Sequence, residues 1–173
     1  MDSEIVFKTN KILSLRRLDT LFEISPIGYI RKNEESAYIE ILPEFHHGLF
    51  RLEMVSHVFI LWWIHENDNP DARQARITIP RVRNTEIPPE KMGTFATRSP
   101  RRPNPIGMTL VKITKITNSH IYIDFMDAFD GTPVIDIKPY LPNGDRVDEE
   151  ITLPPWFSHL QKSRKEDLRE NTK

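Results

Sequence analysis

The chain has 173 residues, of which 38% are hydrophobic and 28% charged, and this composition is typical of one folded domain. It contains no cysteine, which excludes disulfide frameworks, thiolate zinc sites and cysteine nucleophiles. The first residues lack the apolar core of a signal peptide, and the longest apolar run, residues 58–64, is too short to span a bilayer. We therefore expect a soluble, cytoplasmic protein.

The net charge of -1 is unevenly distributed along the chain. Residues 71–102 contain eight basic and three acidic residues, which gives +5 there and leaves -6 for the rest. A local excess of positive charge is typical of a surface that contacts a phosphate backbone. A solvated, arginine-rich loop would have the same pattern, so the charge alone leaves both interpretations open.

Residues 1–20 form a predicted N-terminal extension, and the periodicity after them is mostly that of strands. β-Branched and aromatic residues bounded by turn signals predict strands at 24–31, 38–42, 53–64, 108–117, 121–126 and 134–137. The segment 58–64 is apolar on both faces, which predicts a strand that is covered on both sides.

Residues 69–89 are predicted to form a long irregular connection, and the only helix is expected at the C-terminus after Pro154 and Pro155. Short strands with few helices predict a mainly β protein with an antiparallel barrel or rolled sheet. We expect a β-barrel domain over 21–155 and a helix or tail over 156–173.

Several common sites are missing from the sequence. The six glycines are isolated, so neither a G-x-G turn of a Rossmann fold nor a Walker A loop is present. The six histidines form no H-x-H or H-E-x-x-H pattern, and no G-x-S-x-G elbow occurs. The sequence therefore predicts neither a metal site nor a serine hydrolase.

The segment 93–108, GTFATRSPRRPNPIGM, is the first candidate site. Prolines at 100, 103 and 105 stiffen its backbone, and Arg98 could bind a carboxylate or phosphate through its guanidinium. A stiff connector between strands would have the same composition, so both interpretations stay open.

Two further candidates follow apolar strands. In DFMDAFDG, residues 124–131, Asp127 and Asp130 could accept hydrogen bonds from hydroxyls or an amine. Asp130 could equally belong to a turn, and Asp127 could cap backbone amides. His65 directly follows the apolar run 58–64, where it is either a proton acceptor or an ordinary polar residue at a strand end.

Three strings in these segments resemble one family: SHVFILWWIHEND, GTFATRSPRRPNPIGMTLV and DAFDGTPVIDIKPYLP. In order and spacing they are similar to the TsaA-like (YaeB/TrmO-type) proteins, over residues 24–141. The resemblance implies an antiparallel β-barrel that binds S-adenosylmethionine (SAM) and forms a homodimer. It also implies methylation of N6 of threonylcarbamoyl-adenosine beside the tRNA anticodon.

The resemblance assigns roles to residues of this chain. The implied SAM contacts are His65, Glu66, Arg98, Met108, Asp124, Phe125, Met126 and Asp127. The candidates for the general base are Asp127, Asp130 and His65. The expected contacts to tRNA phosphates are Arg73, Arg76, Arg81, Arg83, Arg101 and Arg102.

Two departures from the family pattern concern the site. The family commonly has a PRQPG loop after its first strand, whereas here RKNEESAYIEI follows Ile30. The usual histidine–glutamine pair is His65-Glu66 in this chain, which replaces a neutral amide with a carboxylate. Two alternative functions therefore stay open: an RNA-binding barrel without catalysis, and a SAM-dependent methyltransferase with a small-molecule substrate.

Overall fold

A computed structural model describes residues 13–17, 20–33, 36–82 and 85–157. The chain divides into two compact units. The barrel unit consists of Met1–Asp68 and Pro105–Leu141, and the arm unit consists of Asn69–Asn104 and Pro142–Lys173.

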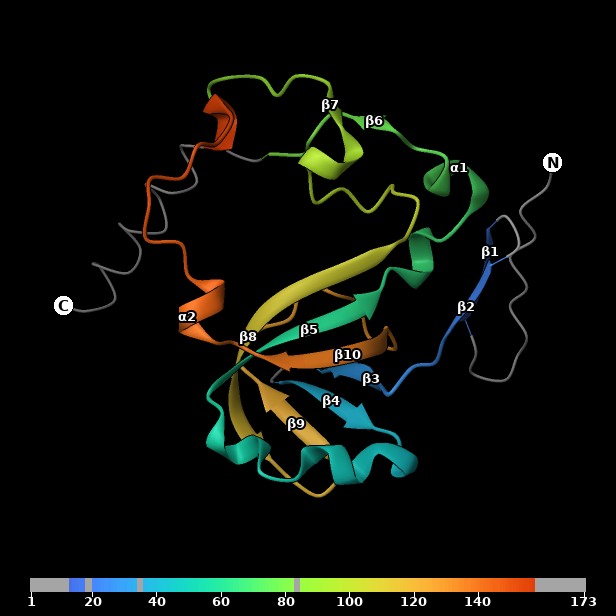
Figure 1. The fold of residues 1–173 in the computed structure, drawn as a ribbon, viewed down its shortest axis with the longest axis vertical. Helices are drawn as coiled ribbons and strands as arrows, with labels where there is room; N and C mark the ends of the chain where they lie inside the picture. The colour runs from blue at the N-terminus through green and yellow to red at the C-terminus, as the bar shows by residue number, and fades with distance from the viewer. Residues whose placement is uncertain (1–12, 18–19, 34–35, 83–84, 158–173) are drawn as a thin grey trace. The chain divides into compact units, whose positions relative to one another are not determined.

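The barrel unit contains a closed antiparallel barrel of six strands in the order β10-β3-β4-β9-β8-β5 (Figure 1). The strands are β3 Gly28–Lys32, β4 Ala37–Ile41, β5 His57–Trp63, β8 Ile106–Ile116, β9 His120–Ile123 and β10 Pro133–Pro139. This architecture confirms the predicted mainly β, antiparallel barrel fold.

The interior of the barrel is filled by aliphatic side chains that alternate along the strands. The fully buried ones include Ile30, Ile39, Ile60, Ile121 and Val134. Burial of each such side chain stabilises the fold by about 1.5–3 kcal/mol. Two 3-10 helices, η1 Pro43–Leu49 and η2 Leu52–Met54, lie together at one end of the barrel (Figure 1).

Two predicted strands differ from the observed ones. The prediction at 24–31 was wrong in joining two strands, because β2 Thr20–Ile24 pairs with β1 Leu13–Arg17, and β3 begins only at Gly28. Pro26 lies in the break and cannot donate a ladder hydrogen bond. The prediction at 53–64 began too early, because Glu53 and Met54 lie in η2, where both are exposed, and β5 begins only at His57.

The expectation that residues 58–64 are covered on both faces is confirmed only in part, and Trp63 is fully buried. Val58 and Ile60 point into the barrel and are fully buried, whereas Phe59 and Leu61 are only half-buried. A closed barrel has an interior and an exterior, so an apolar strand in it keeps one face partly open to solvent.

The arm unit contains short elements: α1 Pro70–Arg73, β6 Ile77–Thr78, β7 Met92–Gly93, η4 Thr94–Ala96 and α2 Pro142–Asp145. The Asn69 side chain accepts a hydrogen bond from the Ala72 amide and caps α1. Residues 155–157 are helical, and the remainder of the expected C-terminal helix lies outside the described residues. The division into segments 1–20, 21–155 and 156–173 stays a prediction. Within the described ranges, no helix is long and apolar enough to cross a membrane.

Candidate functional site

Pairing of β5 with β8 brings two of the predicted segments together in the barrel unit. Trp63 lies opposite Ile106, and Leu61 lies opposite Met108. Just beyond the paired strands, the Ile64 amide donates a 2.7 Å hydrogen bond to the Pro105 carbonyl. His65 therefore lies next to the start of β8, although 40 residues separate the two in the chain.

Gly107 allows close approach of an indole ring at this end of the barrel. A Cβ built on Gly107 would lie 2.3 Å from Cε2 of Trp62, so the ring occupies the space that any other side chain would need. The Trp62 indole N–H donates to Oγ1 of Thr109 at 3.0 Å. Gly107 thus leaves room for the Trp62 ring, and the ring N–H orients the Thr109 hydroxyl.

Thr109 connects β8 to the third predicted segment. Its buried hydroxyl donates a 2.6 Å hydrogen bond to Oδ1 of Asp127 while accepting from Trp62. A hydrogen bond to an ionised carboxylate is stronger than one between neutral groups. Asp127 is exposed, so its carboxylate is accessible to a ligand while one of its oxygens is bonded to Thr109.

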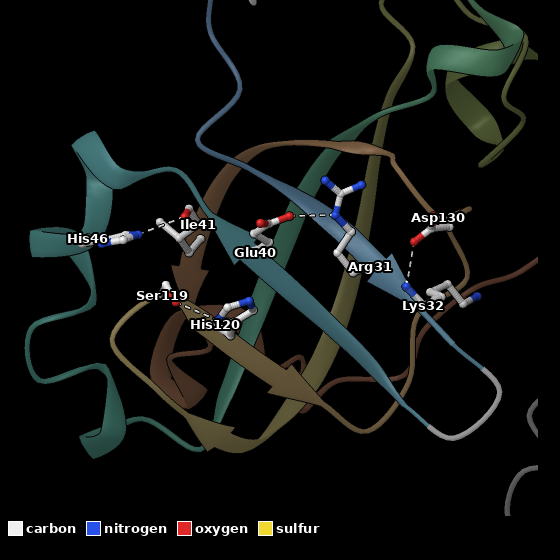
Figure 2. A network of polar contacts seen from close by, with 8 residues as sticks. All are labelled: Arg31, Lys32, Glu40, Ile41, His46, Ser119, His120 and Asp130. Carbon is white, nitrogen blue, oxygen red and sulfur yellow. Dashed lines mark hydrogen bonds and ion pairs between the residues drawn. The ribbon is translucent and has the colours of Figure 1, made fainter.

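The segment 124–131 is held by the last residue of β3. The Lys32 ammonium donates to the carbonyl oxygens of Met126 and Ala128 at 2.8 and 3.2 Å. The backbone amide of Lys32 also donates to Oδ1 of Asp130 at 2.8 Å (Figure 2). The Gly131 amide bonds to the Ile30 carbonyl. These contacts restrict the loop before any ligand is bound.

The predicted cofactor contacts in this segment differ in exposure. The side chain of Met126 lies in the core at 3% exposure, so it could offer a ligand only its main chain. One oxygen of Asp124 accepts from the Lys112 amide beside an irregularity in the β8–β9 pairing. Phe125 is 59% exposed, and Met108 on β8 is 47% exposed. These two apolar side chains are therefore accessible to a ligand.

His65 and Glu66 begin the short helix η3 His65–Asn67. Within the described residues neither side chain forms a hydrogen bond or an ion pair. His65 is half-buried and Glu66 is exposed. Their side chains are therefore free to interact with a ligand.

In the arm unit, hydroxyl groups order the backbone around Arg98. Thr97 donates to the Thr94 carbonyl at 2.9 Å and accepts from the Ser99 amide at 3.2 Å. Ser99 in turn accepts from the Arg101 amide. The Arg98 side chain is exposed and forms no hydrogen bond or ion pair within the described residues. These hydrogen bonds between hydroxyl groups and the backbone stiffen the segment further, in addition to the effect expected from its prolines.

Several arginines of the arm unit that are predicted to contact RNA instead form hydrogen bonds within the unit. Arg73 donates to the Pro103 carbonyl, and Arg101 donates to the Asp71 carbonyl, each at 3.4 Å. Arg76 and Arg102 also donate to backbone carbonyls. Arg81 is exposed, and Arg83 lies outside the described residues.

Four residues that the sequence did not identify shape the site: Lys32, Trp62, Gly107 and Thr109. The pattern of the sequence offers no signal for Lys32, because its loop partners lie more than 90 residues away. The inward position of Thr109 between Gly107 and Val111 is a weak signal, since a buried hydroxyl in a barrel needs a partner.

The exposed groups are chemically suited to SAM. Apolar Met108 and Phe125 could contact an adenine ring, while the Asp127 carboxylate could accept hydrogen bonds from ribose hydroxyls or an amine. Arg98 could pair with a carboxylate. No group of three histidine or acidic side chains in the described part of the chain could hold a metal ion.

A sequence profile of the tRNA-methyltransferase O N-terminal domain family matches residues 20–146, which is most of the chain. The chain belongs to this family. The match includes the end of β5, the segment 93–108 and the loop 124–131.

Two archaeal relatives support the assignment. A "Probable S-adenosyl-L-methionine-binding protein" of Pyrococcus horikoshii is 48% identical over 117 residues, which cover 68% of this chain and 81% of that protein. One with the same description from Methanocaldococcus jannaschii is 42% identical, and the matched region covers 68% of this chain and 91% of that protein.

A mouse tRNA (adenine(37)-N6)-methyltransferase is 43% identical over 99 residues, but these cover 57% of this chain and only 22% of the mouse protein. The crystal structure of TrmO from Pseudomonas aeruginosa has a TM-score of 0.59 and 31% identity. That match covers 79% of this chain and 62% of the crystallised chain. These two family members are therefore longer than the region they share with this chain.

Proposed function

We propose that the chain binds SAM and methylates N6 of an adenosine in tRNA, namely threonylcarbamoyl-adenosine beside the anticodon. The observation that carries the proposal is the hydrogen bond from Thr109 to Asp127. It joins the loop 124–131 to β8, whose first residues adjoin His65. Family membership and the names of the relatives support both the cofactor and the substrate class.

Bound SAM would supply a methyl group activated by its sulfonium. Transfer to nitrogen is an in-line displacement, so the protein mainly has to align donor and acceptor. We assign the adenosine moiety to Met108, Phe125 and Asp127. Arg98 would bind the carboxylate of the methionine moiety or of the threonine substituent. Asp124, Met126, His65 and Glu66 complete the proposed cofactor contacts, with Met126 acting through its main chain.

The acceptor nitrogen lies in a urea-like linkage and is a poor nucleophile until it loses its proton. The proposed bases are His65, Asp127 and Asp130. Asp127 and Asp130 each have one oxygen engaged with the protein and a second available, while the His65 imidazole has no hydrogen bond within the described residues. No metal ion is needed for this chemistry.

The activity is tested with labelled SAM and tRNA from cells that contain or lack the threonylcarbamoyl modification. Label in modified tRNA alone supports the proposal. Tight tRNA binding without label would indicate an RNA-binding barrel without catalysis, and label in small molecules would indicate a different substrate.

The cofactor site is tested with Arg98→Ala. Loss of an ionic contact to a carboxylate should weaken SAM binding at least about tenfold in calorimetry, while the thermal melt stays nearly unchanged because the side chain is exposed. Arg81→Ala removes another exposed arginine of the same unit and should leave SAM binding unchanged. A collapsed melt for Arg98→Ala would instead mean that Arg98 is structural.

The homodimer and the cytoplasmic location stay predictions. Leu110 on β8 exposes apolar surface on the outside of the barrel, which is compatible with a partner subunit.

A further inference from the structure

The exterior of β3, β4, β9 and the adjoining part of β8 carries aromatic and basic side chains in register, with the acidic Glu40 among them. Tyr38 of β4 lies opposite Arg31 of β3 on one side and Tyr122 of β9 on the other. Residues directly opposite each other on neighbouring strands point to the same side of a sheet. The interior side of these strands is occupied by buried Ile30, Ile39 and Ile121, so this set faces outward. We call it the aromatic face, and it comprises Tyr29, Arg31, Tyr38, Lys115, His120 and Tyr122.

Three rings of the aromatic face form a continuous cluster across two strands. The Tyr38 ring lies 5.2 Å from His120 and 5.3 Å from Tyr122, centroid to centroid, and His120 lies 6.2 Å from Tyr122. Ser119 bonds to Nδ1 of His120 at 2.7 Å and orients its ring (Figure 2). All three residues are half-buried, so only part of their ring surface is accessible to a ligand.

Cations flank the rings on both sides. The Lys115 ammonium lies 5.6 Å from the centroid of Tyr122, and the Arg31 guanidinium lies 5.6 Å from that of Tyr29. Nε of Arg31 donates to Glu40 at 2.7 Å, which raises the pKa of Arg31 and orients the guanidinium (Figure 2). Its two terminal nitrogens have no partner within the described residues, so they could donate to a phosphate.

The aromatic face borders the proposed cofactor loop. Arg31 is followed by Lys32, whose amide and ammonium hold Asp130, Met126 and Ala128. A strand of RNA that crosses the face towards β3 would therefore arrive at the loop that contains Asp127.

We propose that the aromatic face binds the single-stranded anticodon loop of the tRNA substrate. Bases would stack on Tyr38, Tyr122 and His120, while Arg31 and Lys115 contact phosphates. Single-stranded RNA is typically recognised by aromatic side chains on an open sheet with basic groups beside them. The identification of the RNA as tRNA rests on the proposed function. The presence of a surface on which bases can stack does not depend on it.

The inference is tested with Tyr38→Ala and Tyr122→Ala, using fluorescence anisotropy of a labelled anticodon stem-loop. Each lost stacking contact should weaken binding by about 5- to 150-fold. Binding of a fully paired RNA duplex and of SAM should stay unchanged. Tyr→Phe at either position keeps the ring and should retain most of the affinity.

Tyr140→Ala is the matched control, because Tyr140 forms an aromatic pair with Phe59 of β5, outside the aromatic face. It should leave stem-loop binding unchanged. If the tyrosine variants do not fold, ultraviolet crosslinking of the unsubstituted protein to the stem-loop serves instead. Crosslinks at Tyr38 or Tyr122 support the proposal, and crosslinks only elsewhere overturn it.

The outcomes separate this inference from the proposed function. Unchanged stem-loop affinity and an unchanged KM for tRNA in Tyr38→Ala and Tyr122→Ala would overturn the aromatic face while leaving methyl transfer intact. If these substitutions dissociate a dimer without changing the affinity for RNA, the aromatic face contacts a second copy of the chain. That result would also overturn the proposal that the face binds RNA. Tyrosine-dependent RNA binding without SAM binding would retain the face and reject the methyltransferase.

Discussion

At the scale of single residues, the absence of a side chain at Gly107 helps to position Asp127, a candidate for the general base. Gly107 leaves space for the Trp62 ring, the ring N–H bonds to Thr109, and Thr109 bonds to Asp127. Each contact is local, but together they connect β5 to the loop that follows β9. A change at Gly107 should therefore affect both packing and ligand binding.

We predict that Gly107→Ala lowers the free energy of unfolding by about 1–3 kcal/mol, because the new methyl group would overlap the Trp62 ring. SAM affinity should fall with it, since Thr109 and Asp127 lose their orientation. Urea denaturation and calorimetry measure the two effects.

Gly48→Ala is the control for this substitution, because nothing lies within 4 Å of a Cβ at Gly48. It should change the free energy of unfolding by less than about 0.5 kcal/mol. Equal stability of the two alanine variants would contradict the role given to Gly107.

At the scale of elements, the end of β3 restricts the loop 124–131. The Lys32 ammonium contacts two carbonyl oxygens of the loop, and its amide contacts Asp130. The loop has little regular structure of its own, so these bonds contribute much of its order.

Lys32→Met should release this loop while preserving the barrel. Hydrogen bonds from a charged donor contribute about 1.5–3 kcal/mol, so amide hydrogen exchange in residues 125–130 should accelerate about tenfold or more. Exchange in β4 and β5 should change little. Weaker SAM binding should accompany the faster exchange.

Lys138→Met provides a comparison, because the Lys138 ammonium pairs with the partly exposed Asp136 on its own strand. Exposed ion pairs contribute little to stability, so loop exchange should match that of the unsubstituted protein. If Lys32→Met and Lys138→Met exchange alike, Lys32 does not hold the loop.

Strand positions were predictable where alternation and punctuation agreed. Residues 38–42 and 121–126 predict β4 and β9 with errors of one to three residues at their ends. Residues 53 and 54 of η2 were mistaken for the start of a strand, although Met54 is exposed and does not pack against the core. The β1–β2 hairpin was missed, since residues 1–20 were taken together as an extension.

At the scale of the whole molecule, the basic segment 71–102 should contribute to the salt dependence of RNA binding. Several of its arginines donate to backbone carbonyls of the arm unit, whereas Arg81 is exposed. Each phosphate contact releases condensed counterions from the nucleic acid.

Arg81→Ala should therefore reduce the slope of log K for tRNA against log salt concentration by about 0.7–0.9. Filter binding over a range of salt concentrations measures the slope. Arg146→Ala, which removes an arginine outside this segment that pairs with Asp148, should leave the slope unchanged. Equal slopes for both variants would place the phosphate contacts elsewhere.

The sequence by itself determined the family, the mainly β fold and the segments that supply the candidate site, because strand periodicity and long motifs are local properties of the chain. It also indicated Arg98, His65 and Asp127 as residues of interest. The tertiary structure alone decided that Met126 faces the core, that Lys32 holds the loop and that Thr109 joins Asp127 to β8. These contacts depend on barrel closure and strand register, which bring together residues that no local pattern relates. The aromatic face has the same origin, since its rings come from strands that become neighbours only when the barrel closes.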